Sequence, residues 1–381
     1  MSSPYAQLWA LRPDVDFLNH GSFGATPREV LAAQAAYRVE MEAEPVSFLA
    51  RRLGGMLDDV RATLAGYLRA DVAGLVLVPN ASTGVSTVLA STKWSPGDEI
   101  LMCDQTYNAV KQMVFALADR HGVVPVECRA PFPLRTADEL VEAYASGINP
   151  RTRLVIVDHV SSPTGIVFPV ARIVALARAA GVPVLVDGAH APGFMPLDLD
   201  ALDADFYTGN LHKWLCAPKG AAFLWLRDEW RVGKVRPLVV SHGYRMGLAA
   251  EFNWLGTVDP TAWLAVPAAI AFAARFPEAA EWNHALVREG RRRVAAALDV
   301  ELPHPDDRAL YGSMAAVPVP QAGRADFAVL SGLNEQMYRR HRIEVPFMGY
   351  DGRVFVRISG QLYNAPEQYE RLARALQHMD Y

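Results

Sequence analysis

The chain alternates short apolar runs with segments of helical periodicity. Runs such as Leu154–Val157 are apolar on both faces, as expected for strands that helices cover on both sides. The candidate strands are Gly74–Val78, Glu99–Cys103, Val123–Glu127, Leu154–Val157, Pro183–Val186, Asp205–Thr208 and Ala222–Leu226. Helices are predicted between them, for example over Asn108–Asp119, Ala137–Ala145 and Val170–Ala180. This alternation predicts a mainly parallel α/β sheet with helices on both faces.

The pattern changes after residue 258. The remaining predicted elements are helices over Thr261–Phe276 and Glu278–Leu298, an isolated strand over Met314–Pro318, a helix over Phe327–Arg340, a strand over Val354–Ser359 and a helix over Pro366–Met379. A chain of 381 residues is long enough for two domains. We therefore expect an N-terminal segment over 1–20, a large domain over 21–258 and a smaller α+β domain over 259–381.

Composition narrows the class of protein. Hydrophobic residues make up 51% of the chain and charged residues 20%, and the net charge of -4 gives no reason to expect a nucleic-acid partner. Cys103, Cys128 and Cys216 lie far apart, so neither a disulfide framework nor a metal site is indicated. The first twenty residues lack a signal-peptide core, and the apolar stretch Ala262–Ala274 is too short for a bilayer. We expect a cytoplasmic protein without a membrane partner.

Polar residues follow the predicted strands, at the edge where parallel sheets bind ligands. Ser82 and Thr83 follow the first strand and open a helix, whose free N–H groups would suit a phosphate. An ordinary helix cap is the alternative. Tyr107 follows the next strand, where its ring could stack on a flat cofactor or simply pack.

Two further strand ends carry a carboxylate and an amine. Asp187 ends an apolar strand, where its charge needs a cation or several donors, and a protonated pyridine nitrogen would serve. A helix-capping role is the alternative. Lys213 follows the next strand, and a lysine among apolar neighbours has a lowered pKa, which favours imine formation with an aldehyde. His190 and His212 lie beside these two residues and could reach a phenolic oxygen or a phosphate.

Three motifs carry a resemblance to a known family. They are Val186-Asp187-Gly188-Ala189-His190, His212-Lys213-Trp214 and Val356-Arg357-Ile358-Ser359. They resemble the class V aminotransferases, which are fold-type I enzymes dependent on pyridoxal 5'-phosphate (PLP), and the similarity runs along nearly the whole chain. The opening segment 17–27 looks most like the isopenicillin N epimerase-like branch. The resemblance implies a fold-type I PLP-dependent transferase with a mainly parallel seven-stranded-type sheet and a smaller C-terminal α+β domain.

The resemblance also implies a role for each matching residue. Lys213 would hold PLP as a Schiff base and move the Cα proton, Asp187 would pair with the pyridine nitrogen, and Tyr107 would stack on the ring. The remaining implied contacts are Ser82, Thr83 and His212 with the phosphate, Ser162 or His190 with the phenolic oxygen, Arg357 with the substrate α-carboxylate, and Asn19 and Asn364 with the substrate. Gly256 and Thr257 resemble a segment that reaches a phosphate across a dimer interface, which implies a homodimer with shared active sites.

The reaction stays open at this stage. The branch resemblance favours an amino-acid epimerase, which needs a second acid opposite Lys213, and the candidates are His159, His190, Tyr107 and His242. The alternatives are a β-eliminating C–S lyase on a cysteine derivative or sulfoxide, an aminotransferase, and a PLP-binding scaffold without turnover. The candidates for recognising the substrate side chain are Arg245, Arg353, His242 and Tyr350. A cysteine desulfurase is disfavoured, because no cysteine follows Cys216.

Overall fold

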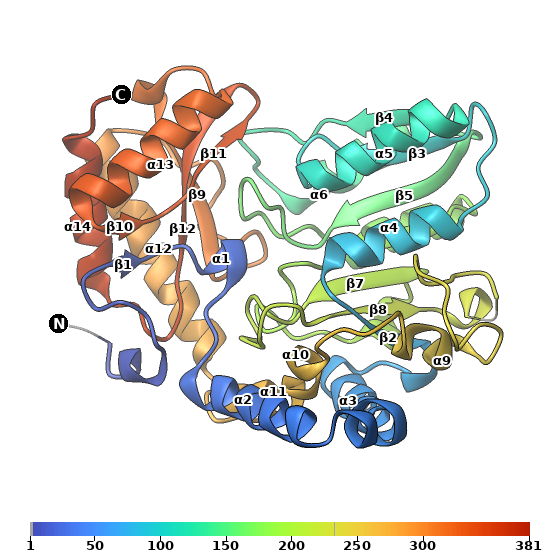
Figure 1. Ribbon diagram of the computed structural model, residues 1–381. Helices are drawn as coiled ribbons and strands as arrows, with labels where there is room; N and C mark the ends of the chain where they lie inside the picture. Colours follow the sequence, from blue (N-terminus) through green and yellow to red (C-terminus); the bar gives the residue numbers. More distant parts are fainter. Residues whose placement is uncertain (1–2, 232) are drawn as a thin grey trace.

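The computed structural model describes residues 3–231 and 233–381 and centres on a seven-stranded sheet (Figure 1). The strand order is β2-β8-β7-β6-β5-β3-β4, and β8 alone runs in the direction opposite to the other six strands. The strands are β2 Leu75–Val78, β3 Glu99–Cys103, β4 Val124–Cys128, β5 Thr152–Asp158, β6 Val184–Asp187, β7 Phe206–Asn210 and β8 Ala222–Leu226. The predicted mainly parallel sheet is confirmed.

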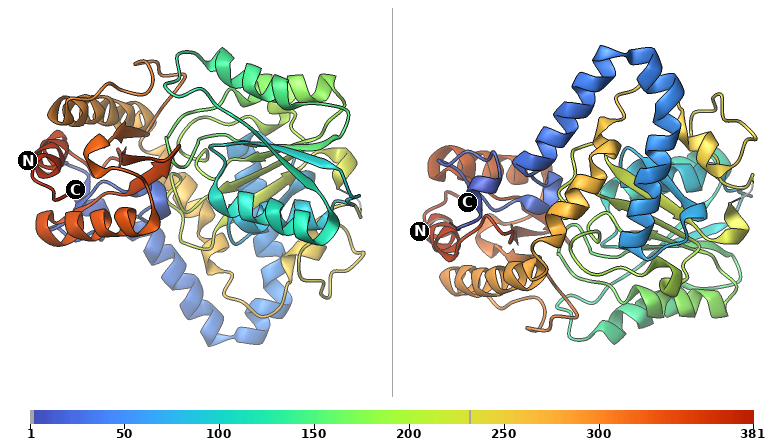
Figure 2. Two further views of the ribbon diagram at one scale, coloured as in Figure 1. Left: turned by 90° about the horizontal axis from the view of Figure 1, so that it is seen from above. Right: turned by 90° about the horizontal axis from the view of Figure 1, so that it is seen from below.

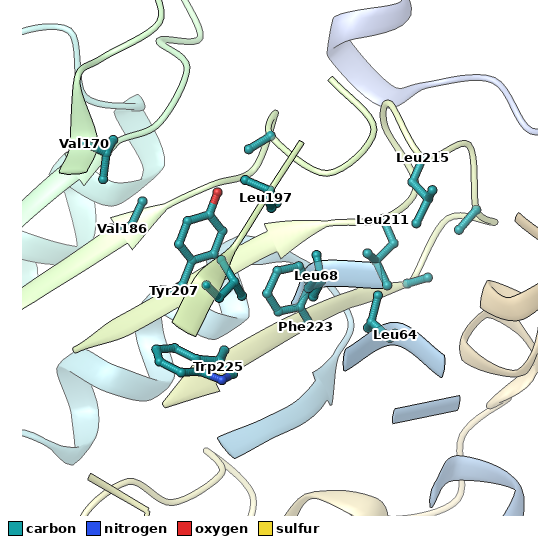
Figure 3. Close-up of a cluster of buried hydrophobic side chains, with 14 of the residues drawn as sticks. Leu64, Leu68, Val170, Val186, Leu197, Tyr207, Leu211, Leu215, Phe223 and Trp225 are labelled. Carbon is teal, nitrogen blue, oxygen red and sulfur yellow. The ribbon is translucent and has the colours of Figure 1, made fainter. Parts of the chain in front are cut away.

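Helices cover both faces of this sheet, which explains why its strands are apolar on both sides. The covering helices are α3 Leu53–Leu68, α4 Ala81–Ser91, α5 Asn108–His121, α6 Ala137–Gly147 and α7 Val170–Ala179. Apolar side chains of α4 and α5 form one buried cluster with every second residue of the strands. Apolar side chains of α3, α6 and α7 form another cluster with the intervening strand residues, which point to the opposite face. Figure 3 shows part of the second cluster, where Leu64 and Leu68 of α3 lie near Phe223 and Tyr207.

A second, smaller sheet lies beside the first (Figure 1, orange and red). It has the antiparallel order β11-β12-β9, with β9 at Met314–Pro318, β11 at Phe347–Tyr350 and β12 at Arg353–Ser359. The strand Met314–Pro318 has the predicted bounds but is not isolated, because β12 pairs with it. The helices of this part are α12 Ala279–Leu298, α13 Phe327–His341 and α14 Pro366–Gln377.

The N-terminus belongs to both parts of the molecule. Its strand β1, Asp16–Phe17, pairs in parallel with β10, Ile343–Glu344, and α1, His20–Phe23, follows directly. Helix α2, Arg28–Ala43, and α3 then form a hairpin that projects from the body in both views of Figure 2. The sequence pattern did not predict this hairpin, β10 or β11.

The helix predicted over Thr261–Phe276 is wrong in one respect. The structure divides it into α10, Thr261–Leu264, and α11, Val266–Ala274, with Ala265 between them. Pro267 lies in the first turn of α11, where its missing N–H costs no helical hydrogen bond. Both helices pack on α2 and α3, and their apolar side chains belong to the core of the large sheet. The division of the chain at residues 20 and 258 stays a prediction, and this packing favours a boundary after α11.

The remaining elements are short. They are helices α8 Leu199–Leu202 and α9 Leu248–Asn253, and single turns at Ala6–Leu8, Ser47–Arg52, Val72–Gly74, Asp228–Trp230 and Pro320–Ala322. Within residues 3–231 and 233–381, none of the helices combines the length and apolar character that crossing a membrane requires.

Candidate active site

Two carboxyl groups meet at the ends of neighbouring strands. Asp158 of β5 and Asp187 of β6 are register partners, and both are buried. Burial and, to a smaller extent, the charge of Asp187 raise the pKa of Asp158 to about 8, and burial also raises the pKa of Asp187. Asp187 Oδ1 accepts the N–H of Ala189 at 2.9 Å. Asp158 Oδ1 accepts the N–H of Tyr107 at 3.2 Å, and its Oδ2 is buried with no partner in the described chain.

Lys213 lies in the loop after β7, close to these carboxyl groups. Its Nζ is 3.2 Å from Nε2 of His190. Burial lowers the pKa of Lys213 to about 7, and the positive charge of Arg357 acts in the same direction, against the charges of Asp187 and Asp158. A large fraction of the amine is therefore uncharged near neutral pH, which is the form that attacks an aldehyde.

The start of α4 is held against the end of β7. Asn210 Oδ1 accepts the N–H of Ala81 at 2.9 Å, which ties the helix to the strand that leads to Lys213. A Cβ atom on Gly84 would lie 2.2 Å from Thr208 Oγ1, so glycine is required for this close approach. The side chain of Asn80 caps the helix by accepting from both the N–H and the hydroxyl of Thr83, at 2.8 and 3.0 Å.

The hydrogen bonds of the helix cap involve one of the residues predicted to bind the phosphate. Thr83 takes part in the helix cap, as the alternative interpretation held, whereas the Ser82 side chain makes no hydrogen bond within the described residues. His212 is partly buried, and its Nδ1 lies 3.3 Å from the carbonyl oxygen of Ala221. Ser82 lies in the first turn of α4, whose partial positive charge suits an anion, and His212 follows Asn210, which binds the start of that helix. Their phosphate-binding roles stay predictions.

Arg357 is a buried cation without an anionic partner. Its side chain is 2% exposed and donates to the carbonyl and hydroxyl oxygens of Ser162 and, at 3.1 Å, to Ser22 Oγ. Its Nε is buried with no partner, and no Asp or Glu of the described chain pairs with it. Burial lowers the pKa of Arg357 to about 10, and Tyr107 opposes that shift. A buried, unpaired guanidinium is costly alone, so the arrangement suits a ligand carboxylate.

The opening motif of the chain packs directly on the lysine loop. Gly24 has φ +68°, and a Cβ atom there would lie 2.1 Å from the carbonyl oxygen of His212 and 2.9 Å from Lys213 Cα. His20 is fully buried, with Nε2 2.9 Å from the Lys213 carbonyl oxygen and Nδ1 2.8 Å from the hydroxyl of Tyr363. The segment therefore braces the lysine loop against the C-terminal part of the chain.

Sequence reasoning missed three residues of this site: Asp158, His20 and Ser22. Ser22 links two predicted substrate contacts, because it donates to Asn19 Oδ1 at 2.5 Å and accepts from Arg357. His20 and Ser22 lie inside the opening motif, so the motif was the available signal. Asp158 opens the polar run Asp158–Gly165 directly after an apolar strand, but its burial beside Asp187 depends on the strand order.

Asn364 lies outside this cluster of contacts. It is fully buried and donates to the carbonyl oxygen of Phe17 and to Gln368 Oε1, both at 2.9 Å, while it accepts the N–H of Gln361 at 3.0 Å. These bonds join the N-terminal strand to the segment before α14, which is a structural role. Its contact with substrate stays a prediction.

The other candidates are dispersed. His242 is exposed in a hollow beside Leu49 and Trp254, and Thr257 is exposed on the segment between α9 and α10, next to Gly256. Of the candidates for recognising the substrate side chain, Tyr350 and Arg353 are register partners that both contact Phe132, whereas Arg245 stacks on Tyr244. Arg353 also pairs with Asp351, and the Tyr350 hydroxyl donates to Asp104 at 2.9 Å. The four candidates are not gathered in one cluster, so the pocket for the side chain stays undefined.

Comparison with known proteins decides the family. The family model described as Aminotransferase class-V matches residues 18–372. The chain belongs to this family. It is 37% identical to an isopenicillin N epimerase of Amycolatopsis lactamdurans, over 97% of this chain and 96% of the relative. It is 36% identical to a putative L-cysteine desulfhydrase of Oryza sativa subsp. japonica, over 94% of this chain and 82% of the relative.

Solved structures agree with this class V assignment. A cystine C–S lyase in complex with its reaction product cysteine persulfide superposes with a TM-score of 0.77 at 25% identity, covering 96% of this chain and 98% of that one. A cysteine desulfurase from Thermococcus onnurineus NA1 superposes with a TM-score of 0.81 at 20% identity, covering 99% and 98%, which supports the fold alone. The protein is a PLP-dependent enzyme of fold-type I, as the sequence predicted.

The residues present fit PLP. The unpartnered Oδ2 of Asp158, the carboxyl group of Asp187, the amine of Lys213 and the helix start at Ser82 offer sites for a pyridine nitrogen, an aldehyde and a phosphate. A glycine at position 84 lets that helix start approach β7. Each assignment of a residue to an atom of the cofactor stays a prediction.

Proposed function

We propose that this class V enzyme is an amino-acid epimerase that acts at the Cα atom and resembles the isopenicillin N epimerases. One observation carries the proposal: the low-pKa amine of Lys213 and the unpaired guanidinium of Arg357 belong to one buried site. PLP, when bound, acidifies the Cα hydrogen of an amino acid by withdrawing electrons. Such chemistry needs a base near Cα and a cation that holds the α-carboxylate.

Each of these two residues then has a defined task. Arg357 would bind the α-carboxylate through its unpartnered Nε and a terminal nitrogen, because a planar guanidinium matches a carboxylate in a bidentate pair. Lys213 would accept the proton from Cα, and a pKa of about 7 lets its amine both take up and release a proton near neutral pH. Asp187, buried at the end of β6, would stabilise a protonated ring nitrogen.

Inversion requires a second proton donor, and the structure favours Tyr107 among the four candidates. His190 contacts Lys213 itself, and His242 is exposed in another hollow. His159 binds the Tyr207 hydroxyl at 2.8 Å, and burial lowers the pKa of His159 to about 4, so at neutral pH its ring is uncharged and is not the imidazolium acid that would donate a proton. Tyr107 comes from the end of β3, on the other side of Asp187 from the Lys213 loop, and lies close enough to Arg357 to affect its pKa.

A C–S lyase acting on a cysteine derivative is the second candidate. Its support is the similarity to the cysteine desulfhydrase at 36% identity and to the cystine lyase structure at 25%. Elimination of sulfur from Cβ begins with the same proton transfer to Lys213 but needs no donor on the opposite face. An aminotransferase is the third candidate.

A homodimer is part of the proposal. Exposed apolar side chains gather in the stretch before and after α9, where Val240 is 61% and Met246 is 71% exposed. Gly256 and Thr257 lie in the same stretch, so a second copy covering it would bring these residues to a neighbouring site. The cytoplasmic location also stays a prediction.

Proton NMR of the PLP-loaded enzyme in D2O tests the reaction. The enzyme is offered a panel of amino acids and cysteine sulfoxides. Deuterium at Cα together with growth of the other enantiomer supports an epimerase, whereas pyruvate and a released sulfur compound would establish the lyase instead. Tyr107→Phe sharpens the test, because it should retain exchange of one enantiomer and lose inversion by about 100-fold. Equal loss of both would remove Tyr107 as the second donor.

A further inference from the structure

Trp214, the residue after Lys213, makes a hydrogen bond that the proposed reaction does not yet use. Its indole is 4% exposed and packs edge-on against Phe194, with ring centroids 5.0 Å apart. Its Nε1 donates to Nδ1 of His190 at 3.2 Å. An indole N–H can only donate, so Nδ1 of His190 must be the unprotonated nitrogen of the imidazole.

The position of the imidazole proton follows from this bond. Burial lowers the pKa of His190 well below its usual value, so the ring is neutral and carries one proton. That proton lies on Nε2, which is 3.2 Å from Lys213 Nζ. Because Nε2–H is a donor, the amine of Lys213 must accept, and only an uncharged amine has the lone pair to do so.

We propose that Trp214 is a positioning residue: by donating its indole N–H to Nδ1, it fixes His190 as an Nε2–H donor that faces the amine of Lys213. This inference rests on the proposed role of Lys213 and adds the device that keeps its amine ready to react. Packing alone does not explain the tryptophan. A phenylalanine would fill the same apolar cluster of Val160, Phe194 and Met314 without supplying the N–H.

Other charges also act on this pair. The pKa of Lys213 is affected by Arg357, Asp187 and Asp158. The pKa of His190 is affected by Lys213, Arg357, His212 and His20. Trp214→Phe changes none of these charges. In that variant His190 is free to move its proton to Nδ1 and offer Nε2 to a lysine ammonium. The pKa of Lys213 should then rise, and the shift reports the hydrogen bond from Trp214 alone.

The first measurement needs no cofactor, and its decisive spectrum is that of the wild-type protein. Nitrogen-15 NMR of the cofactor-free protein with labelled histidine, with His190 identified by the signal missing in His190→Gln, should show His190 protonated at Nε2. Trp214→Phe should show a protonated Nδ1 in part or in full. A wild-type His190 protonated at Nδ1 overturns the proposal, even if Trp214→Phe does not fold.

The second measurement follows Lys213. The rate at which PLP combines with the cofactor-free protein is recorded against pH, and its midpoint should move up by about one pH unit in Trp214→Phe. Trp9→Phe is the matched control, because Trp9 is also buried and donates its Nε1 to a carbonyl oxygen, that of Ala25, at 3.1 Å. An unchanged midpoint in Trp214→Phe, or an equal shift in Trp9→Phe, overturns the proposal.

The two proposals can fail separately. Mass spectrometry after borohydride reduction identifies the lysine that carries PLP. If another lysine carries it while His190 is protonated at Nε2, the proposed function falls and the role of Trp214 towards His190 stands. If Lys213 carries PLP but His190 is protonated at Nδ1, the opposite holds.

Discussion

The edge of the large sheet around Lys213 and the stretch around α9 differ in almost every physical respect. At the sheet edge, Asp158, Asp187 and Arg357 are buried. Gly24 and Gly84 pack so closely on their neighbours there that a Cβ atom at either position would overlap with them. Around α9, Val240 and Met246 are exposed, and the polar candidates have separate partners.

The buried sheet edge and the exposed stretch around α9 serve two different kinds of function. The chemistry at Cα depends on charges whose energies are large because they are desolvated. Substrate choice and assembly depend on surfaces that one chain leaves uncovered. A change at the sheet edge should therefore affect every substrate, whereas a change around α9 should affect assembly and leave the folded chain intact.

The largest effect is expected from Lys213→Ala. Turnover should fall at least about 10⁴-fold, because the proposed base is gone, and the absorbance band of the Schiff base should disappear. The check is a steady-state assay with an absorbance spectrum of the PLP-loaded protein. Lys219→Ala is the matched control, since Lys219 lies in the same loop but is exposed and bonds to Thr26. A Lys213→Ala protein with the normal rate would rule out the assignment.

Asp187→Ala should reduce kcat by roughly 100-fold or more while weakening PLP retention less. Removal of a buried carboxylate leaves a protonated ring nitrogen without its counter-charge. Parallel measurement of kcat and of the PLP dissociation constant separates the two effects. Asp158→Asn gives the comparison, because Asp158 lies next to Asp187 in register yet is protonated at neutral pH by its raised pKa. Equal rates in wild type and Asp187→Ala would exclude the proposed role.

Arg357→Lys should raise KM for the amino acid about 10-fold or more, because an ammonium cannot form the bidentate pair with the α-carboxylate. Initial-rate kinetics with the favoured substrate measures this change. Arg353→Lys serves as control, since Arg353 lies on the same strand but is exposed and paired with Asp351. If KM is the same in both variants, the carboxylate site lies elsewhere.

A smaller effect concerns stability. The pKa of Lys213 is lowered in the fold to about 7 from an ordinary 10.5, so the unfolded chain binds more protons between these values. The cofactor-free protein should therefore gain stability from this group as pH rises from 7 to 10.5, and lose it as pH falls. Tm measured across that range should rise less in Lys213→Met than in wild type. Parallel curves would show that the amine is charged in the fold.

The smallest effect on the fold is expected from Val240→Ser. An exposed substitution changes the free energy of unfolding by only about 0.5 kcal/mol, yet a polar group in a dimer interface should favour the monomer. Sedimentation velocity measures the assembly, and a denaturation curve measures the fold. A wild-type dimer that persists in Val240→Ser would move the interface to another surface.

The strands of the main sheet could be predicted from the sequence, whereas the contacts that support the lysine loop could not. Strands such as β5 are apolar on both faces, and that property is local, so they could be predicted to within a few residues. The contact of Gly24 with Lys213 joins positions far apart in the chain, and no local pattern encodes it. The burial of Asp158 likewise depends on which strand lies beside β5. The break at Ala265 was foreseeable, because Pro267 marks the start of a new helix.

The hydrogen bonds of His20 have a consequence for biosynthesis. This one side chain touches the carbonyl of Lys213 and the hydroxyl of Tyr363, so the lysine loop is braced by a segment that precedes it and by one that lies far beyond it in the sequence. A ribosome makes Tyr363 well after Lys213, and domains fold as their residues emerge. The growing chain can thus form most of the large sheet before the lysine loop has its full support. We expect the cofactor site to be completed only after the segment that contains Tyr363 has emerged from the ribosome.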